Sequence, residues 1–363
     1  MNAPDPWAPI RWGRCEVPNR LVVAPMTTYS SRPDGVISDD EIPYLRRRAE
    51  GGFGAVMTAA CCVHPGGKAF VGQWACWDDR FLPSLRRVAD SIREGGAVSV
   101  LQIHHGGRRC PSLVCGGQPV SASAVPLDDA AEVPRALAGD EVEELVEAFG
   151  AAAARGQAAG FDAIEIHGAN TYLLQQFVSP HSNRRTDAWG RDRLLFSERV
   201  SRSVLEAVGP EFPVGYRFSP EEPLTPGIRL ADTLALIDRL MALPLAYLHV
   251  SLRAWDQPSL HGGTEPILAT LASHIDRRVP LIGVGAIRSL EDVRGAMALG
   301  ADQVALARVA ISDPEWPLKV RAGAAVRLRV PRHEPGTLLT LPKGLEAKIL
   351  STPGWFDVED PPA

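Results

Sequence analysis

The sequence predicts a single α/β domain built as a (β/α)8 barrel. Eight short apolar runs rich in β-branched residues alternate with stretches of helical periodicity along the 363 residues. Helical stretches rather than hairpin turns separate the runs, so the strands are expected to pair in parallel. Such a barrel commonly takes about 250 residues plus insertions, which this length allows. A doubly wound open sheet is the alternative, but the number of strands favours closure.

The expected strands and helices follow one another in strict alternation. The strands are residues 21–26, 55–61, 98–104, 163–167, 214–218, 246–251, 280–285 and 303–309. The helices are residues 39–50, 81–94, 140–159, 194–208, 230–243, 266–276 and 290–299. Ser289 with Asp292, and Ser38 with Glu41, have the spacing of capping boxes, which marks the start of a helix.

Two segments fall outside this alternation. The loop after the third strand, roughly residues 110–139, is rich in Pro, Ser and Ala, and loops of this length usually serve as lids or binding surfaces. The chain beyond Gly323 is rich in proline and is expected to form an extended tail. Because it retains apolar residues, we expect residues 325–363 to pack on the barrel or on a neighbouring subunit. The whole chain, 1–363, is expected to form one domain.

Composition and charge argue against several function classes. A net charge of −5 without any block of Lys or Arg predicts no surface for nucleic acid. No apolar run reaches the roughly 18 residues of a membrane span, and the first residues do not resemble a secretion signal, so a cytoplasmic protein is expected. The 6 cysteines form neither a Cys-x-x-Cys pair nor an iron–sulfur pattern, which predicts thiols without a metal.

The most informative stretch is residues 162–190, which begins in the fourth expected strand. In this fold the chemistry lies at the carboxyl ends of the strands. His167 and Asn170 are three residues apart, a spacing that puts both side chains on one side of a helical turn, and Tyr172 follows. Two donors beside a phenol suit an oxygen that gains negative charge during a reaction. Capping of the next helix is the alternative interpretation.

Glycine and a basic residue follow the last two strands. The seventh strand runs into Gly285, and the eighth runs into Ala307 and Arg308. This is the usual phosphate site of the fold, where backbone N–H groups approach an anion. A tight turn without a ligand is the alternative for the Gly-x-Gly motif.

The remaining residues at the strand ends disfavour several chemistries. The four lysines all lie elsewhere, which argues against a Schiff base. Acidic residues do not cluster there, which argues against paired catalytic carboxylates or a Mg²⁺ site. The histidines at the ends of strands three and four have no carboxylate beside them for a metal. The strand ends thus offer neutral hydrogen-bond donors, one arginine and a site for a phosphate. This set suits a phosphorylated organic cofactor that supplies the chemistry itself.

Residues 162–190 also resemble a known family, the old yellow enzymes, which are FMN-dependent ene-reductases and NAD(P)H:flavin oxidoreductases. The resemblance rests on His-Gly-Ala-Asn, Tyr-Leu-Leu-x-Gln-Phe, Ser-Pro, Asn-x-Arg-Thr-Asp and Trp-Gly in this order. Further matches run from Asn19 to about Trp316. The resemblance implies a (β/α)8 barrel that binds FMN without a covalent bond and takes electrons from NAD(P)H.

The resemblance assigns the cofactor to a set of matching positions. They are Ala24, Pro25, Met26, Thr27, Ala60, Gln102, Arg217, Gly285, Ala307 and Arg308. The first four match the segment under the isoalloxazine, and Thr27 would hydrogen-bond the flavin C4 carbonyl. Ala60 and Gln102 match contacts of the pyrimidine edge, and the last three match the phosphate site. Arg217 would lie beside N1 and O2, where its charge stabilises the reduced anion; a salt bridge with Glu165 is the alternative.

The resemblance also implies the catalytic residues. His167 and Asn170 match the pair that grips the substrate carbonyl. Tyr172 matches the tyrosine that protonates Cα, and Tyr29 matches another active-site tyrosine. Arg109 falls where part of the family has a basic residue, and a solvated loop arginine is the alternative there.

Two features depart from the family pattern. Ala307 replaces a usual glycine before Arg308, which restricts how closely the backbone can approach a phosphate. The loop after Gly190 is shorter than in the family, which puts the expected subunit contacts in question rather than the chemistry.

The implied reaction has two halves that use one site. NAD(P)H would reduce FMN and leave, and a small electrophilic alkene or a quinone would then enter. A dienoyl-CoA reductase or amine dehydrogenase is an alternative, although the cysteines for its iron–sulfur cluster are absent. A flavin-binding redox sensor without turnover is a further alternative. The sequence leaves open the physiological substrate, the choice between NADH and NADPH, and the oligomeric state, a homo-oligomer included.

Overall fold

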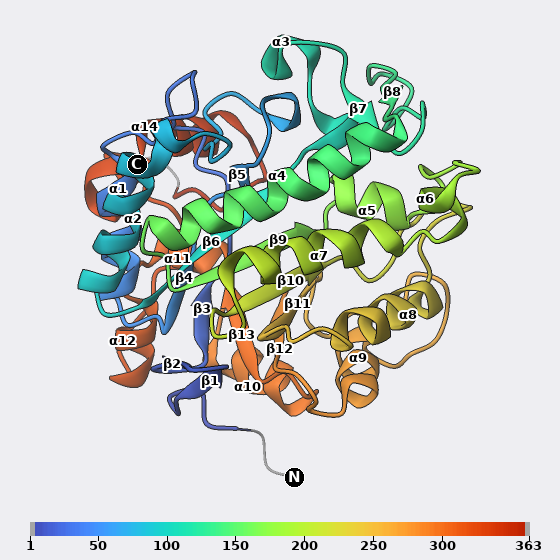
Figure 1. Ribbon diagram of the computed structural model, residues 1–363. Helices are drawn as coiled ribbons and strands as arrows, with labels where there is room; N and C mark the ends of the chain where they lie inside the picture. The colour runs from blue at the N-terminus through green and yellow to red at the C-terminus, as the bar shows by residue number, and fades with distance from the viewer. Residues whose placement is uncertain (1–3, 360–363) are drawn as a thin grey trace.

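The computed structural model describes residues 4–359, and its centre is a closed barrel of eight parallel strands (Figure 1). The strands are β3 (Leu21–Val23), β4 (Ala55–Met57), β6 (Val98–His104), β9 (Ala163–Gly168), β10 (Val214–Phe218), β11 (Tyr247–Ser251), β12 (Leu281–Val284) and β13 (Gln303–Leu306). Neighbours in this order pair in parallel, and β13 pairs with β3, which closes the barrel. The (β/α)8 fold expected from the sequence is confirmed.

Several strands are shorter than the apolar runs that predicted them. The first run, 21–26, leaves the ladder after Val23, and the last, 303–309, leaves it after Leu306. The residues that follow are loops at the carboxyl end of the barrel, so they line its opening instead of its wall. A two-residue strand, β5 (Cys61–Cys62), pairs with the end of β6.

Helices connect the strands and surround the barrel (Figure 1). The long outer helices are α1 (Glu41–Glu50), α2 (Leu82–Glu94), α4 (Gly139–Ala158), α7 (Leu195–Val208), α8 (Leu230–Met241), α9 (Ile267–Ile275) and α10 (Leu290–Ala298). Each buries one apolar stripe, as Leu85, Val88 and Ile92 do in α2. The capping box expected at α10 is present, because Ser289 Oγ accepts from the Asp292 amide at 3.1 Å and the Asp292 carboxylate accepts from the Ser289 amide at 2.8 Å.

A hairpin closes the amino-terminal end of the barrel (Figure 1). It consists of β1 (Ile10–Trp12) and β2 (Cys15–Val17). Trp12 is fully buried; its Nε1 donates to Gln303 Oε1 at 2.7 Å, and its ring centre lies 4.5 Å from that of Tyr247. Because this end is plugged by side chains, a ligand site is left to the opposite end.

The insertion after β6 lies at that opposite end (Figure 1). It contains η3 (Gly107–Arg109), α3 (Ser112–Cys115), β7 (Val120–Ser121) and β8 (Arg135–Ala136), and the last two pair with each other. Gln176 of α5 (Leu173–Val178) fastens it, since its Oε1 accepts from the Arg108 amide at 3.1 Å and from Ser121 Oγ at 2.9 Å. The long loop expected here is therefore partly structured and anchored on residues 162–190.

The segment after Gly323 packs against the outside of α1. α11 (Arg308–Ser312) and α12 (Trp316–Arg321) precede it, and it contains α13 (Pro335–Leu339) and α14 (Lys343–Ser351). Nη2 of the buried Arg48 donates to the Leu339 carbonyl at 3.2 Å. The tail expected to be extended is thus partly helical, because Pro335 and Pro342 stand at helix starts, where proline is tolerated.

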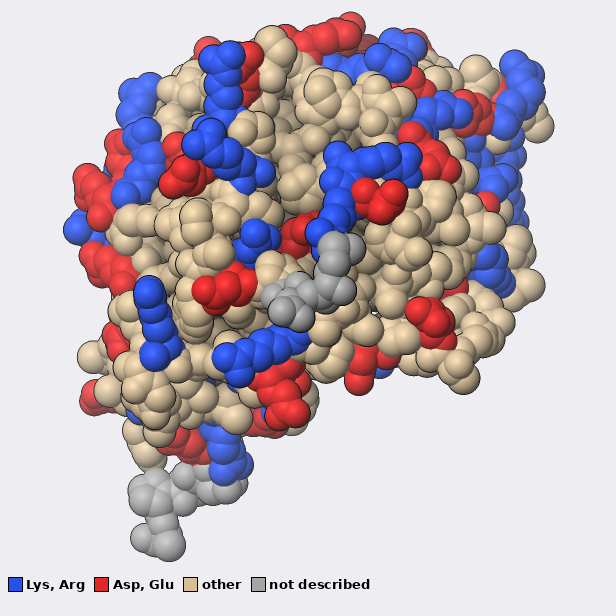
Figure 2. Space-filling model, turned by 90° about the horizontal axis from the view of Figure 1, so that it is seen from below, with Lys and Arg blue, Asp and Glu red and all other residues tan. Residues whose placement is uncertain are grey.

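The surface carries mixed charge. On the face seen from below, Lys and Arg side chains are interspersed with Asp and Glu (Figure 2). No helix within residues 4–359 is long and apolar enough to cross a membrane. Across the same residues, no three His, Cys, Asp or Glu side chains form a group suited to a metal ion.

Candidate active site at the barrel opening

The loop after β3, residues 24–31, reaches the barrel opening and is held by one buried carboxylate. Glu41, the first residue of α1, is fully buried. Its carboxylate accepts hydrogen bonds from the Thr28 hydroxyl, from Ser31 Oγ at 2.9 Å and from Trp74 Nε1 at 2.6 Å. Thr28 and Ser31 flank Tyr29, whose backbone is left-handed with φ 55°. The course of the loop therefore depends on Glu41, which the sequence suggested only as a helix-capping residue.

This loop lines a cavity of about 430 Å³ at the opening. The lining residues are Met26, Thr27, Tyr29, Ala307, Arg308, Gly354, Trp355 and Phe356. The Trp355 ring meets Tyr29 edge-on, with ring centres 6.3 Å apart. Residues expected at the flavin ring thus share a cavity with the expected phosphate residue Arg308 and with the C-terminal segment.

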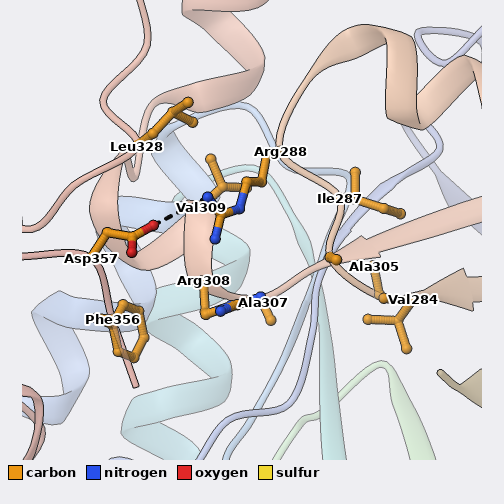
Figure 3. Close-up of a pocket in the computed structure, with 12 residues that line it drawn as sticks. Val284, Ile287, Arg288, Ala305, Ala307, Arg308, Val309, Leu328, Phe356 and Asp357 are labelled. Carbon is orange, nitrogen blue, oxygen red and sulfur yellow. Dashed lines mark hydrogen bonds and ion pairs between the residues drawn. The ribbon is translucent and has the colours of Figure 1, made fainter. Parts of the chain in front are cut away.

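A second, smaller cavity of about 40 Å³ lies at the ends of β12 and β13 (Figure 3). Gly285 has φ 147°, and a Cβ there would stand 2.8 Å from the Ala254 carbonyl carbon, so a side chain is excluded. The backbone N–H groups of Gly285, Ala286 and Ala307 donate no hydrogen bond within residues 4–359. Unpaired N–H groups beside the exposed Arg308 fit an anion such as a phosphate ester.

The C-terminal segment borders this second cavity. Phe356 and Asp357 lie along it together with Arg308, and the Asp357 carboxylate pairs with Arg288 at 3.1 Å (Figure 3). Arg308 has no carboxylate partner in the described chain. The charge of Arg288 is therefore compensated, while that of Arg308 remains for a ligand.

His167 is the penultimate residue of β9 and is a neutral donor. It is buried, and its Nδ1 accepts from the Ala169 amide at 3.3 Å, which assigns the ring proton to Nε2. Burial lowers the pKa of His167 well below the ordinary 6.5, and the charge of Arg217 lowers it further. At neutral pH the ring can therefore donate from Nε2 without carrying a charge.

Asn170 is positioned by a short chain of hydrogen bonds. Its Oδ1 accepts from Ser251 Oγ at 3.1 Å, and Ser251 Oγ accepts from Arg217 Nη2 at 3.1 Å. With Oδ1 occupied, Nδ2 is left to donate to a ligand. Asn170 and Thr171 are left-handed, with φ 58° and 62°, so the helical turn expected from the His-x-x-Asn spacing does not form.

Arg217 and Glu165 lie inside the barrel without the direct salt bridge that was considered as an alternative. Glu165 is fully buried, and its carboxylate accepts from His249 Nδ1 at 2.8 Å and from Gln102 Nε2 at 2.7 Å. Burial lowers the pKa of Arg217, whereas the charge of Glu165 raises it. Arg217 Nε has no partner in the described chain, so the guanidinium keeps a donor for a ligand.

Tyr172 stands between two histidines. Its ring centre lies 4.2 Å from that of His104 and 5.1 Å from that of His167, both edge-on. His104 Nδ1 is hydrogen-bonded to Gln73 Nε2 at 2.9 Å. Burial raises the pKa of the Tyr172 phenol above the ordinary 10.0, while the nearby Arg109 opposes this shift. The phenol therefore holds its proton at neutral pH.

The other expected cofactor residues contribute backbone shape. The Ala24 amide donates to the Leu306 carbonyl at 2.9 Å and so joins the ends of β3 and β13 beside Pro25. The Ala60 carbonyl accepts from Gln73 Nε2 at 3.1 Å. These positions hold the loops in place and carry no side chain that could take part in acid–base chemistry.

The structure adds residues that sequence analysis did not select. They are Glu41, Gln73, His104, His249, Ser251 and the C-terminal pair Trp355 and Phe356. Two of these residues could have been predicted from the sequence, because side chains two residues apart on a strand face the same side of the sheet. Ser251 lies two residues after His249, and His104 lies two after Gln102. The contacts of Trp355 and Glu41 carry no such signal.

The chain matches the family described as NADH:flavin oxidoreductase / NADH oxidase over residues 7–326. It therefore belongs to this family of NAD(P)H-dependent flavin oxidoreductases, and its structural neighbours place it among the old yellow enzymes.

Several relatives match this chain over nearly their whole length. The probable NADH-dependent flavin oxidoreductase YqiG of Bacillus subtilis is 41% identical over 352 residues, which cover 94% of each chain. Morphinone reductase has a TM-score of 0.80 at 29% identity and covers 90% of this chain and 91% of its own. The old yellow enzyme homologue from Zymomonas mobilis has a TM-score of 0.78 at 25% identity and covers 89% and 94%.

Proposed function

We propose that this protein binds FMN at the barrel opening and uses NAD(P)H to reduce the activated C=C bond of α,β-unsaturated carbonyl or nitro compounds. One observation carries the proposal. The unpaired backbone N–H groups of Gly285, Ala286 and Ala307 form an anion cradle beside Arg308. Three neutral donors lie at the same end of the barrel: His167, Asn170 and Tyr172. The cradle suits the phosphate of the cofactor, and the donors suit an oxygen of the substrate.

The residues present fit FMN. Gly285, Ala307 and Arg308 would hold the phosphate through backbone N–H groups and one guanidinium. Thr27 and the unpaired Nε of Arg217 would contact the ring. The Thr27 hydroxyl makes no hydrogen bond within the described chain. When bound, FMN supplies the chemistry that takes a hydride from NAD(P)H and gives it to the alkene.

Gln102 would present its amide to the ring edge. One N–H of Nε2 donates to Glu165, which leaves the second N–H to donate and the Oε1 atom to accept. Ala24, Pro25, Met26 and Ala60 would form the apolar wall on which the ring lies. Their contribution is shape and exclusion of water.

The substrate would be activated by two donors and protonated by a third. His167 Nε2 and Asn170 Nδ2 donate to the carbonyl or nitro oxygen, which gains negative charge as the alkene is reduced. Tyr172, kept protonated by burial, delivers its proton to Cα as a general acid. Tyr29 would line the substrate site together with Trp355, which its ring contacts.

The two half-reactions of the purified protein test this function. The protein should be isolated with a yellow flavin that NADH or NADPH bleaches without oxygen, and cyclohexenone should restore the colour. Release of FMN on denaturation would identify the cofactor. A colourless protein that does not take up added FMN would contradict the cofactor, and reoxidation by quinones but never by enones would contradict the substrate class.

A further inference from the structure

Arg109 stands at the barrel opening, beside the donors of the active site. It ends η3, and its Nη1 donates to Thr171 Oγ1 at 2.9 Å. Its guanidinium carbon lies 5.5 Å from the centre of the Tyr172 ring. Thr171 is the residue between Asn170 and Tyr172, so one hydrogen bond fixes the cation next to both.

The charge of Arg109 is not compensated by the protein. The guanidinium is exposed, and no carboxylate of residues 4–359 pairs with it. His104 and His167 are neutral because burial lowers the pKa of each, and Tyr172 is protonated because burial raises its pKa. These three side chains therefore supply no negative charge to Arg109.

Three other arginines near the opening are already balanced or assigned. Arg217 lies in the field of the buried Glu165, and Arg288 pairs with Asp357. Arg308 belongs to the anion cradle at the ends of β12 and β13. Arg109 is therefore an additional cation, on the side of the opening where the substrate donors lie.

We infer that Arg109 recognises a carboxylate of the substrate, so that the preferred substrates are α,β-unsaturated carbonyl compounds bearing a carboxylate next to the reacting alkene. The inference rests on the proposed reduction of such alkenes. A guanidinium binds a carboxylate through two parallel hydrogen bonds, which gives orientation as well as attraction. A carboxylate placed there would hold the alkene beside the Tyr172 phenol. The phosphates of NAD(P)H are the other source of negative charge, and the test separates the two.

The test compares an acid with its neutral ester. The probes are 4-oxo-2-pentenoate and its methyl ester, used to reoxidise the NADH-reduced holoenzyme in stopped flow. The wild type should react faster with the acid. Arg109→Gln should lower the acid-to-ester ratio of rate constants by about 5- to 50-fold, the range for a charged hydrogen bond in a partly exposed site. Arg109→Lys should recover part of the ratio because it retains the charge.

Binding without turnover gives a second readout. Titration calorimetry of the oxidised holoenzyme with 4-oxopentanoate should show weaker binding in Arg109→Gln, by a similar factor. Arg202→Gln, which removes the same charge from the outer helix α7, is the matched control and should leave the acid-to-ester ratio as in the wild type.

Each contrary result has its own meaning. Equal rates for acid and ester in the wild type would overturn the inference while leaving ene reduction intact. A loss confined to flavin reduction by NADH in Arg109→Gln would overturn it by assigning the residue to the nicotinamide cofactor. If neither probe reoxidises the wild-type enzyme, the proposed function fails, and the inference fails with it.

Discussion

Burial decides the protonation state of two titratable groups at the barrel opening, His167 and Tyr172. It lowers the pKa of His167 and raises the pKa of Tyr172, so the two shifts move in opposite directions from neutrality. Both side chains consequently remain neutral donors over a wider pH range than free imidazole and phenol do. Tyr172 and His167 are therefore both uncharged at neutral pH.

A first prediction follows for pH dependence. The affinity of the oxidised holoenzyme for a neutral ketone such as cyclohexanone should stay constant as pH falls through 6.5 or rises through 10.0. These are the ordinary pKa values of histidine and tyrosine, from which His167 and Tyr172 are shifted. The sign is clear, because a lowered histidine pKa keeps His167 neutral as pH falls through 6.5. For the same reason, the contribution of His167 to the free energy of unfolding is present above pH 6.5 and is lost as pH falls below this value. A binding curve with a midpoint near 6.5 would show that His167 titrates normally.

The second prediction concerns Tyr172. Only reduction of a carbon–carbon double bond needs a proton on carbon, whereas a quinone can take protons from solvent on oxygen. Tyr172→Phe should therefore slow reoxidation by enones by roughly 10²–10⁴, the usual contribution of a general acid. Stopped-flow traces with a quinone provide the control and should change far less. An equal loss with both acceptors would mean that Tyr172 shapes the site and donates no proton.

The third prediction concerns Arg217, whose buried charge is not directly paired with Glu165. A positive charge beside the ring favours the negatively charged reduced flavin, so Arg217→Met should lower the flavin midpoint potential. Spectroelectrochemical titration measures this directly, with Arg217→Lys as the variant that keeps a charge. A midpoint potential unchanged in Arg217→Met would remove the residue from the cofactor site.

At the scale of elements, the strands could be predicted well and the loops poorly. The apolar runs located the strands because each buried strand needs continuous hydrophobic residues. The same runs overshot at residues 24–26 and 307–309, because apolar residues also line the opening beyond the ladder. The His-x-x-Asn spacing predicted a helical turn, yet Asn170 reaches the opening through a left-handed backbone.

Glu41 shows why the loop after β3 could not be predicted. Its partners include Trp74, 33 residues away, and a contact at that separation leaves no local pattern in sequence. The spacing to Ser38 indicated a capping box, and the Ser38 amide does donate to Glu41 at 3.0 Å. The same carboxylate, however, also holds Thr28 and Ser31, on which the position of Tyr29 depends.

The fourth prediction tests this anchor. Glu41→Ala should destabilise the folded holoenzyme by about 2–4 kcal/mol, because several buried donors lose a charged acceptor. Glu50→Ala on the same helix, whose carboxylate pairs with Arg46 at an exposed site, should cost much less. Thermal unfolding compares the two. Equal midpoints for both variants would show that the Glu41 hydrogen bonds add little to stability.

At the scale of the whole molecule, the C-terminal segment joins regions far apart in sequence. Trp355 and Phe356 follow the last barrel strand by four helices and a proline-rich stretch, yet they line the same cavity as Met26 and Thr27. Their aromatic side chains predicted that the segment packs, but no local pattern could say where. The segment reaches the opening because α13 is fastened to α1 and because Val330 pairs with Val358.

The fifth prediction is that this segment retains the cofactor. The ion pair of Arg288 with Asp357 holds the end of the segment beside the anion cradle, and the side chains of both residues are about half exposed. Breaking it with Asp357→Asn should speed FMN release about 2- to 5-fold, the range for an exposed pair of up to about 1 kcal/mol. Trp355→Ala should have a larger effect, because it removes a wall of the cavity.

Dialysis against excess apoflavodoxin, followed by absorbance, would measure the release rate. A charge exchange, Arg288→Asp with Asp357→Arg, should return the rate towards that of the wild type, because the pair is restored with its ends reversed. Arg46→Gln, which breaks an exposed ion pair with Glu94 on the outer helices, is the control and should leave release unchanged. If Asp357→Asn, Trp355→Ala and this control all release FMN at the wild-type rate, the segment covers the cavity without holding its contents.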